Sequence, residues 1–426
     1  MKHDIDEGKT LLVDGPASVS LLSGEISVLG APILLEENMI VREGKRLPLW
    51  ARIKSTVELR LGEEASVNET DTGTIPSSWE NTARELLSLD KPVTVTVIGG
   101  VDSGKTSFCT FLVNAAVKEK LKTAIIDADL GQSDIGPPST VGFNFVAEPI
   151  KDLFEINAQD AFFVGSASPS GAISKIIDGL DFLKAKVLDQ APDFVIINTD
   201  GWVEGEEASA YKVRLAKVGG SNAVVGLQQK NELNPILEAL QEIKVFTIAS
   251  PQLVKPRDRE KRKLLRELSY KKYLKEAKMQ SFSLGWITVK NSLLGSGSQI
   301  HGKRLEVLNN LLQNKTVYSE ETVATILVVL KGKGITEEQV KAAEGNFGKR
   351  IKVILKGDEK GLLVGFKNEE NNFLGIGVLH EVDYKRKILK VYTPLNHKPY
   401  MLCFGQIKLN KNFRETGLST IYSNDL

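Results

Sequence analysis

The stretch VTVTVIGGVDSGKTSF, residues 93–108, constrains the fold of this chain more than any other. Residues 93–98 are mostly β-branched, which predicts a buried strand, and the next two glycines end it. Gly99, four further residues and Gly104-Lys105-Thr106 have the spacing of a phosphate-binding loop that opens a helix. Glycines let backbone N–H groups surround an anion, and a helix N-terminus favours negative charge. The stretch therefore predicts a nucleoside triphosphate site.

The residue types of this loop predict particular contacts. Lys105 is placed to reach the β- and γ-phosphates, and the Thr106 hydroxyl can ligate Mg²⁺. A glycine-rich turn that has this spacing by chance is the alternative, but the flanking strand and helix favour the phosphate site. The predicted nucleotide-binding residues are Gly99, Gly100, Asp102, Ser103, Gly104, Lys105, Thr106 and Ser107.

The chain is 426 residues long, which exceeds one ordinary core, and its pattern changes twice. Residues 1–88 carry short apolar runs between Gly, Pro and Asp, typical of an antiparallel sandwich or barrel, and end in a linker helix. Residues 89–281 alternate strands with helices, predicted at 106–119, 172–189 and 234–242, and residues 282–426 return to short strands. The predicted fold is α/β: a central P-loop parallel sheet with covering helices, flanked by β-rich N-terminal and C-terminal domains.

Composition excludes several classes of protein. The formal net charge is +1, so any affinity for nucleic acid must come from a local patch. The two cysteines, Cys109 and Cys403, form no CxxC pair, which argues against a disulfide framework or a zinc site. The N-terminus is charged, and no run of 18 apolar residues occurs. We therefore expect a cytoplasmic protein with no membrane partner.

A second motif follows the strand predicted at 123–127, where the chain reads Asp127-Ala128-Asp129-Leu130-Gly131-Gln132. The carboxyl ends of parallel strands form the ligand edge of such a sheet. Two aspartates at this spacing can face one crevice, where one orients metal-bound water and the other accepts a proton. The alternative is an aspartate that caps the next helix. The phosphate loop upstream favours the catalytic or metal role. The run 136–142 after this motif predicts a rigid turn.

A tryptophan follows the strand predicted at 194–198, in the phrase Thr199-Asp200-Gly201-Trp202. At this edge of the sheet Trp202 is placed to stack on a base, which is worth roughly 1–3 kcal/mol per base. A tryptophan that packs in the domain core is equally common in this context. The sequence alone leaves both roles open.

The segment 255–278 is strongly basic, with eleven Lys or Arg against four Asp or Glu, and its apolar spacing predicts a helix. Arg262 and Arg266 lie one turn apart and share a face. Such a pair suits a lid over a transferring phosphate, a grip on an RNA backbone, or a solvated surface. Spacing does not decide among the three.

Together these motifs resemble the polynucleotide 5′-hydroxyl kinase family, whose members include the kinase subunits of RNA 3′-end processing, tRNA splicing and pre-rRNA processing complexes. The resemblance rests on GGVDSGKT at 99–106, DADLGQ at 127–132, GPPST at 136–140, Thr-x-Gly-Trp at 199–202 and arginines at 257, 262 and 266. It covers the central domain, and the family's three-part layout matches the outline above. Because it has no long extensions, the chain looks like the compact, stand-alone archaeal members.

The resemblance implies that ATP with Mg²⁺ donates its γ-phosphate to the 5′-hydroxyl of RNA, or of DNA. By motif position it makes Asp129 the general base, and it places Thr106 and Asp127 at the metal ion. The implied catalytic residues are Lys105, Asp129, Arg262 and Arg266, with Arg257 in the same lid. The implied acceptor-binding residues are Gln132, Thr199, Gly201, Trp202 and Arg257. The natural RNA, the residues that recognise adenine, the oligomeric state and any protein partners stay open.

Two other functions fit the phosphate loop. One is a scaffold that uses bound ATP only to hold partner proteins. The other is a P-loop switch ATPase or GTPase that hydrolyses nucleotide without a 5′-hydroxyl acceptor. The chain has no clear Asn-Lys-x-Asp element for reading guanine, and the phrase at 229–232 is a poor match, which lowers the odds of a GTPase. Transfer of labelled γ-phosphate to an oligonucleotide discriminates among these functions.

Overall fold

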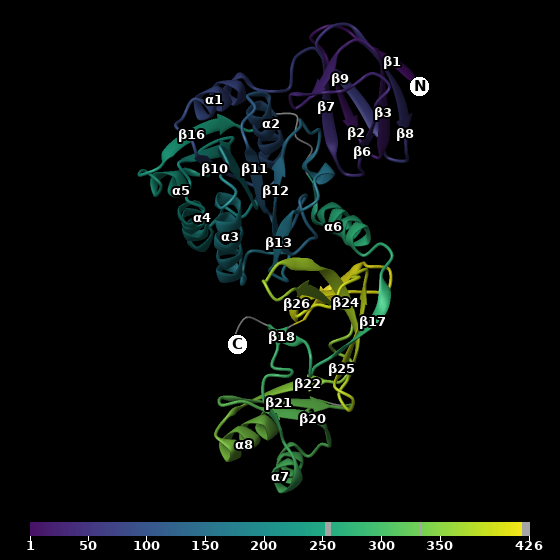
Figure 1. Cartoon of the computed structure of the whole chain (residues 1–426), viewed down its shortest axis with the longest axis vertical. Helices are drawn as coiled ribbons and strands as arrows, with labels where there is room; N and C mark the ends of the chain where they lie inside the picture. Colours follow the sequence, from purple (N-terminus) through teal and green to yellow (C-terminus); the bar gives the residue numbers. More distant parts are fainter. Residues whose placement is uncertain (252–256, 333, 420–426) are drawn as a thin grey trace. The chain divides into compact units, whose positions relative to one another are not determined.

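The computed structural model describes residues 1–251, 257–332 and 334–419 (Figure 1). The chain divides into two compact units, a first unit of Met1–Val164 with Ser168–Arg266 and a second of Gly165–Ala167 with Glu267–Leu426. None of the described helices is long and apolar enough to cross a membrane. The division into three domains at residues 88 and 281 stays a prediction.

The first nine strands form two antiparallel sheets around one apolar core, with strand orders β1-β8-β3-β6 and β5-β4-β7-β2-β9. Along β8 buried and less buried residues alternate, because one face of each sheet packs inward. This confirms the β-rich N-terminal region and makes it a sandwich. The strands are β1 (Lys2–Ile5), β2 (Thr10–Asp14), β3 (Ala17–Ser23), β4 (Ile26–Val28), β5 (Ala31–Pro32), β6 (Asn38–Val41), β7 (Arg46–Ala51), β8 (Ser55–Leu61) and β9 (Ser66–Thr70).

A seven-stranded sheet follows in the first unit, in the order β13-β12-β11-β14-β10-β15-β16. Five strands are parallel, whereas β12 pairs antiparallel with β11 and with β13. The predicted parallel sheet is confirmed. The prediction of a turn over 136–142 is wrong from Thr140 on, because this end of β12 pairs with β13, and Gly142 pairs with β11 as well. The strands are β10 (Val93–Gly99), β11 (Thr123–Ala128), β12 (Thr140–Val146), β13 (Asp160–Phe163), β14 (Phe194–Thr199), β15 (Ala223–Gln228) and β16 (Lys244–Ala249).

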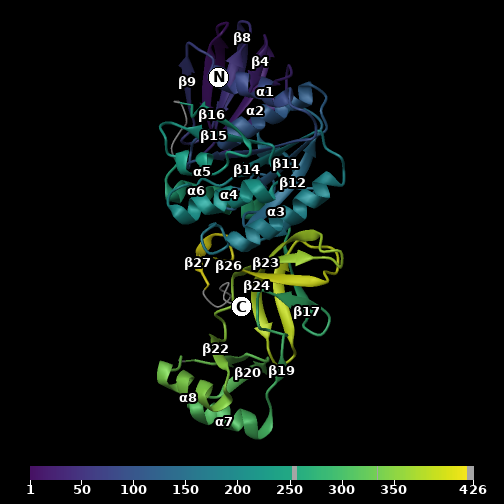
Figure 2. The ribbon, with the colours of Figure 1, turned by 90° about the vertical axis from the view of Figure 1, so that its left-hand side faces the viewer.

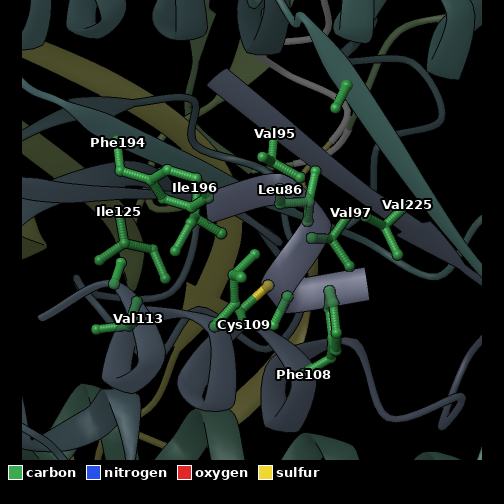
Figure 3. Close-up of a cluster of buried hydrophobic side chains, with 14 of the residues drawn as sticks. Leu86, Val95, Val97, Phe108, Cys109, Val113, Ile125, Phe194, Ile196 and Val225 are labelled. Carbon is green, nitrogen blue, oxygen red and sulfur yellow. The ribbon is translucent and has the colours of Figure 1, made fainter. Parts of the chain in front are cut away.

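Helices cover both faces of this sheet, since its inner strands are buried on both sides. On one face α1 (Ser77–Leu87) and α2 (Lys105–Lys118) share a core with β10 and β14, part of which Figure 3 shows around Phe108 and Cys109. On the other face lie α3 (Ile173–Leu188) and α4 (Glu206–Val218), with α5 (Asn234–Glu238) beyond them. Of these, α4 is absent from the predicted helices, and α5 is shorter than predicted.

The second unit contains two further sheets. One joins β17 (Lys278–Ser283), β18 (Thr288–Lys290), β23 (Leu362–Lys367), β24 (Phe373–Asp383), β25 (Ile388–Thr393), β26 (Met401–Leu409) and β27 (Glu415–Leu418). The other joins β19 (Ser298–Gln299), β20 (Thr316–Glu321), β21 (Thr325–Leu330) and β22 (Arg350–Leu355). The helices α7 (Gly302–Leu312) and α8 (Glu337–Phe347) pack together against one face of this smaller sheet (Figure 2). The β-rich C-terminal region is confirmed, with these two helices added.

Candidate active site

Three neighbouring parallel strands bring the predicted motifs to one edge of the central sheet. Val97 of β10 pairs with Asn198 of β14, and Asn198 pairs in turn with Asp127 of β11. The three strands are therefore in step at their carboxyl ends. The loops that follow them hold the phosphate-loop motif, the Thr-x-Gly-Trp element and the acidic motif. Ligands of such sheets bind at this edge.

The phosphate loop has the backbone that its sequence predicts. Gly104 adopts a left-handed conformation with φ of 94° and precedes α2, whose first turn has neither a side-chain cap nor an acidic residue. A Cβ atom on Gly99 would lie 2.5 Å from Ser103 Oγ and 2.8 Å from the Leu227 carbonyl oxygen, so only glycine fits. The N–H groups at the start of α2 are thus free of side-chain caps and suit an anion.

Two groups in the loop point to a phosphate ligand. The Lys105 ammonium group is almost fully buried, and among the described residues it donates only to the loop's own Gly100 carbonyl oxygen, at 2.6 Å. Burial lowers the pKa of Lys105 to about 8, while the Asp129 and Asp200 carboxylates oppose this. Ser103 Oγ is buried and has no hydrogen-bond partner among the described residues. Because phosphate oxygens would satisfy both groups, these residues fit a bound triphosphate.

Asp127 is held entirely by the protein. Its Oδ1 accepts from Asp129 N at 3.2 Å and Asn198 Nδ2 at 3.0 Å, and its Oδ2 accepts from Asp134 N at 2.8 Å and Ile135 N at 3.3 Å. Burial and the nearby carboxylates raise the pKa of Asp127 to about 7. A carboxylate has about four acceptor positions, so direct metal binding would displace one of these donors. The visible role of Asp127 is to shape the loop after β11.

Among the residues that the structure describes, no group of three or more His, Cys, Asp or Glu could hold a metal ion. This donor set suits Mg²⁺ bound with a nucleotide, because that ion commonly takes one or two protein ligands, phosphate oxygens and water. Thr106 lies half-buried in the first turn of α2, where its hydroxyl is placed for such a site.

Hydrogen bonds from the protein orient the Asp129 carboxylate but use only one of its two oxygens. Its Oδ1 accepts from Gly131 N and from Gln132 N, both at 3.0 Å, whereas Oδ2 receives no hydrogen bond from any described residue. Burial and the Asp200 carboxylate raise the pKa of Asp129 to about 6, and Lys105 opposes this. A fixed carboxylate with one free oxygen and a pKa nearer neutrality is what a general base requires.

The Thr-x-Gly-Trp turn packs on the phosphate loop. Thr199 is fully buried, and its hydroxyl donates to the Val97 carbonyl oxygen at 2.8 Å, so it joins β14 to β10. A Cβ atom on Gly201 would lie 2.7 Å from the Val101 Cα atom, so the turn approaches the loop closely. Trp202 is half-buried. The structure therefore gives Thr199 and Gly201 packing roles and leaves Trp202 as the side chain that reaches the surface.

Replacement of Gly201 tests this close approach. We expect Gly201→Ala to displace the phosphate loop, because the added Cβ meets backbone atoms that cannot turn aside, and to cost about 1–3 kcal/mol of stability. Titration calorimetry with ATP should show an affinity at least about tenfold weaker. Gly345→Ala in α8, where nothing lies within 4 Å of the new Cβ, is the matched control. Wild-type nucleotide affinity in Gly201→Ala would contradict the packing role.

The basic helix α6 (Arg259–Tyr273) contacts the phosphate loop at Asp102. Asp102 Oδ2 accepts from Arg257 N at 2.8 Å and lies 3.4 Å from Arg262 Nη1. Gln132 Nε2 donates to the Arg262 carbonyl oxygen at 3.1 Å. Arg266, one turn further along, is half-buried. Arg262 thus contacts the phosphate loop through Asp102. The start of the predicted basic segment, 255–256, falls outside the described residues.

An ion network joins the N-terminal sandwich to the acidic loop. Arg42, after β6, lies 3.0 Å from Asp134 Oδ1 and 2.8 Å from Asp152 Oδ2, and Lys45 lies 3.3 Å and 3.0 Å from their other oxygens. Burial alone would raise the pKa of Asp152, but Lys45 and Arg42 hold it well below its ordinary value. The turn between β6 and β7 therefore fixes the same loop that Asp127 shapes. It carries no motif, so sequence reasoning missed it.

We expect Asp152→Asn to destabilise the first unit by about 2–4 kcal/mol at pH 7, because two largely buried cations lose a partner. The folded-state pKa of Asp152 lies below that of the unfolded chain. Its stabilising effect is therefore present above about pH 4 and is lost as the pH falls further. Urea unfolding should show the difference from wild type shrinking below pH 4. Asp71→Asn, at an exposed carboxylate, is the control, and a pH-independent difference would contradict the prediction.

Three buried polar residues beside the Trp202 turn are also absent from the predicted site. Asp200 lies inside the Thr-x-Gly-Trp element, and Tyr211 and Lys212 come from α4. The signal that could have identified Asp200 is its position directly after β14, at the edge of the sheet where the phosphate loop also lies. Tyr211 and Lys212 belong to no motif, and only the packing of α4 on the sheet brings them here.

Comparison with known proteins agrees with this geometry. Residues 99–276 match the family model described as mRNA cleavage and polyadenylation factor CLP1 P-loop. The central part of the chain is similar to that family. The resemblance drawn from the five motifs is thereby confirmed, and the matched region runs from the phosphate loop through α6.

Similar proteins include a polyribonucleotide 5′-hydroxyl-kinase of Methanocaldococcus jannaschii, 28% identical over 77% of this chain and 90% of the relative. The protein of that name from Pyrococcus furiosus is 28% identical over 81% of this chain and 95% of its own length. A chain of the solved wild-type Clp1p–Pcf11p complex has a TM-score of 0.69 at 12% identity, over 96% of this chain and 97% of that one. At that identity the structural match shows the fold alone.

Proposed function

We propose that this chain is an ATP-dependent polynucleotide 5′-hydroxyl kinase that transfers the γ-phosphate of ATP to the 5′-hydroxyl of RNA in RNA processing. Relatives named as such kinases align with most of its length. The observation that carries the proposal is the position of Asp129 at the edge where the phosphate loop also opens, with one oxygen that accepts no hydrogen bond from the described residues. A cytoplasmic location stays part of the proposal.

The proposed chemistry divides among the described residues. The free oxygen of Asp129 accepts the proton of the 5′-hydroxyl while the hydroxyl oxygen attacks the γ-phosphorus of ATP. The bond from the γ-phosphorus to its bridging oxygen breaks, and ADP leaves. Lys105 and the N–H groups at the start of α2 hold the phosphates, and Arg262 and Arg266 stabilise the charge on the transferring group. Mg²⁺, when bound near Thr106, neutralises phosphate charge.

Trp202 and Gln132 are the proposed contacts to the acceptor nucleotide, with Trp202 offering its ring face to the terminal base. Thr199 and Gly201 hold the turn that carries Trp202 and do not touch the acceptor themselves. The Thr199 hydroxyl already donates a hydrogen bond to β10. Arg257 supports the lid through its backbone bond to Asp102.

The test is transfer of labelled γ-phosphate from ATP to a 5′-hydroxyl RNA oligonucleotide by the purified chain, with a DNA acceptor of the same sequence in parallel. We expect label at the 5′ end of the RNA, and none on an RNA that already carries a 5′-phosphate. ATP hydrolysis at a rate that does not depend on the acceptor, with no label on the RNA, would indicate a switch NTPase. Bound ATP without turnover would indicate a scaffold. Either result contradicts the proposed kinase.

A further inference from the structure

Lys212, in the middle of α4, carries a fully buried ammonium group. Lys217 on the same helix is exposed, as lysines usually are. A buried charge is costly to remove from water, and a well-packed apolar residue would avoid that cost. A function for this buried ammonium group should therefore be visible in its contacts.

The hydrogen bond and the ion pair of the Lys212 ammonium group both lie on Asp200, and the group also lies 4.9 Å from the centre of the Tyr211 ring. Lys212 Nζ donates to the Asp200 carbonyl oxygen at 2.7 Å and lies 3.0 Å from Asp200 Oδ2. The Tyr211 hydroxyl donates to the same Oδ2 at 2.8 Å, and Asp200 Oδ1 accepts from Trp202 N at 2.9 Å. Asp200 is thus clamped between α4 on one side and the turn that carries Trp202 on the other.

The same two residues of α4 reach the tryptophan and the phosphate loop. The Tyr211 ring lies 6.0 Å from the Trp202 ring, at an interplanar angle of 31°. Gly201, between Asp200 and Trp202, packs against Val101 of the phosphate loop, where an added Cβ would meet Val101 Cα at 2.7 Å. A shift of Asp200 would therefore move Trp202 relative to the phosphate loop.

We propose that Lys212 is a positioning residue for the acceptor: through Asp200 it holds the turn that carries Trp202 in place beside the phosphate loop. This rests on the proposed kinase function and names a residue outside its motifs. Lys212 itself touches no substrate. Its charge also lowers the pKa of both Lys105 and Asp129, so its electrostatic influence extends to the catalytic pair.

Lys212→Met keeps the length of the side chain and removes the charge. We expect kcat/KM for the acceptor oligonucleotide to fall about 10–100-fold, as small misplacements at a reacting centre do, with the Kd for ATP within about threefold of wild type. Lys217→Met, on the same helix but exposed, should behave as wild type. Equal losses for ATP and acceptor, or no loss in a folded Lys212→Met protein, would overturn the proposal.

A double-mutant cycle separates positioning of Trp202 from general stability. If Lys212 acts through Trp202, Lys212→Met should cost much less in a Trp202→Ala background than in wild type. Losses that simply multiply would show that the two residues act independently, which contradicts the proposal.

Removal of the cation alone leaves Asp200 buried and unpaired, which threatens folding. If Lys212→Met does not fold, Asp200→Asn with Lys212→Met takes its place, because the pair leaves no buried charge and the new amide oxygen still accepts hydrogen bonds. An acceptor-selective loss in this pair supports the proposal, and unchanged acceptor kinetics overturn it. A wild-type chain that transfers no phosphate contradicts the kinase function itself, so the two failures are distinguishable.

Discussion

Asp129→Asn should lower kcat for phosphate transfer to a 5′-hydroxyl RNA by about 10²–10⁴-fold, while ATP binds as in wild type. Asparagine keeps the shape of the side chain, and its carbonyl oxygen can still accept from Gly131 N and Gln132 N as Oδ1 does now. The amide nitrogen then stands where the free oxygen Oδ2 stood. An amide nitrogen donates and cannot accept the hydroxyl proton, so only the proton transfer is removed.

The measurement pairs single-turnover transfer of labelled phosphate with calorimetric titration of ATP. Asp181→Asn, which alters an exposed carboxylate on α3, is the control and should retain wild-type rates. Transfer by Asp129→Asn within a few-fold of wild type would remove Asp129 as the base. Loss of ATP affinity together with transfer would instead indicate that the carboxylate holds the nucleotide or the loop.

The strand, loop and helix around residues 93–108 were predictable because local and global signals agree there. The β-branched run needs burial on both faces, and a central parallel strand supplies it. The glycines stand where the backbone requires them, with a left-handed Gly104 and a Gly99 that has no room for a Cβ atom. A structure can be predicted from sequence where residue preferences, turn chemistry and burial all favour the same local structure.

The strand β12 was not predictable from local signals. Its first residues follow Gly136-Pro137-Pro138, which favour a turn, and they pair with β13, which lies later in the chain. A long-range pairing therefore overrode the local preference. The helix α4 is absent from the predicted helices, and its buried residues Tyr211 and Lys212 belong to no motif.

Spacing alone does not say what individual side chains do. Asp127 and Asp129 are two residues apart and looked equivalent, yet the structure gives one four hydrogen bonds and leaves the other a free oxygen. Thr199 has the motif position of an acceptor contact, but its hydroxyl is used within the sheet. A motif places residues at the site, and only the hydrogen-bond partners tell binding groups from supporting ones. The assignment of roles among them stays a prediction.

Arg262→Ala should lower kcat by about 10²–10³-fold with little change in the Kd for ATP. An arginine that meets the transferring phosphate is worth about 10³–10⁵ in such reactions, and here Arg266, one turn away, supplies part of the same charge. The structure places Arg262 Nη1 3.4 Å from Asp102 Oδ2 of the phosphate loop. The guanidinium group is therefore already held at the loop by a carboxylate, and a phosphate group that enters would offer it a second anionic partner.

That ion pair permits a sharper test of what Arg262 does. If its role is only to brace the phosphate loop through Asp102, then Asp102→Asn should reproduce the loss, since it removes the same ion pair from the other side. If Arg262 acts on the transferring phosphate, Asp102→Asn should cost less than about tenfold, because asparagine still accepts from Arg257 N and the loop binds phosphate through its backbone. Arg259→Ala, at an exposed position of α6, controls for loss of positive charge from the helix. Equal losses in Arg262→Ala and Asp102→Asn would make Arg262 a structural brace, and a larger loss in Arg262→Ala alone identifies it as the group that stabilises the transferring phosphate.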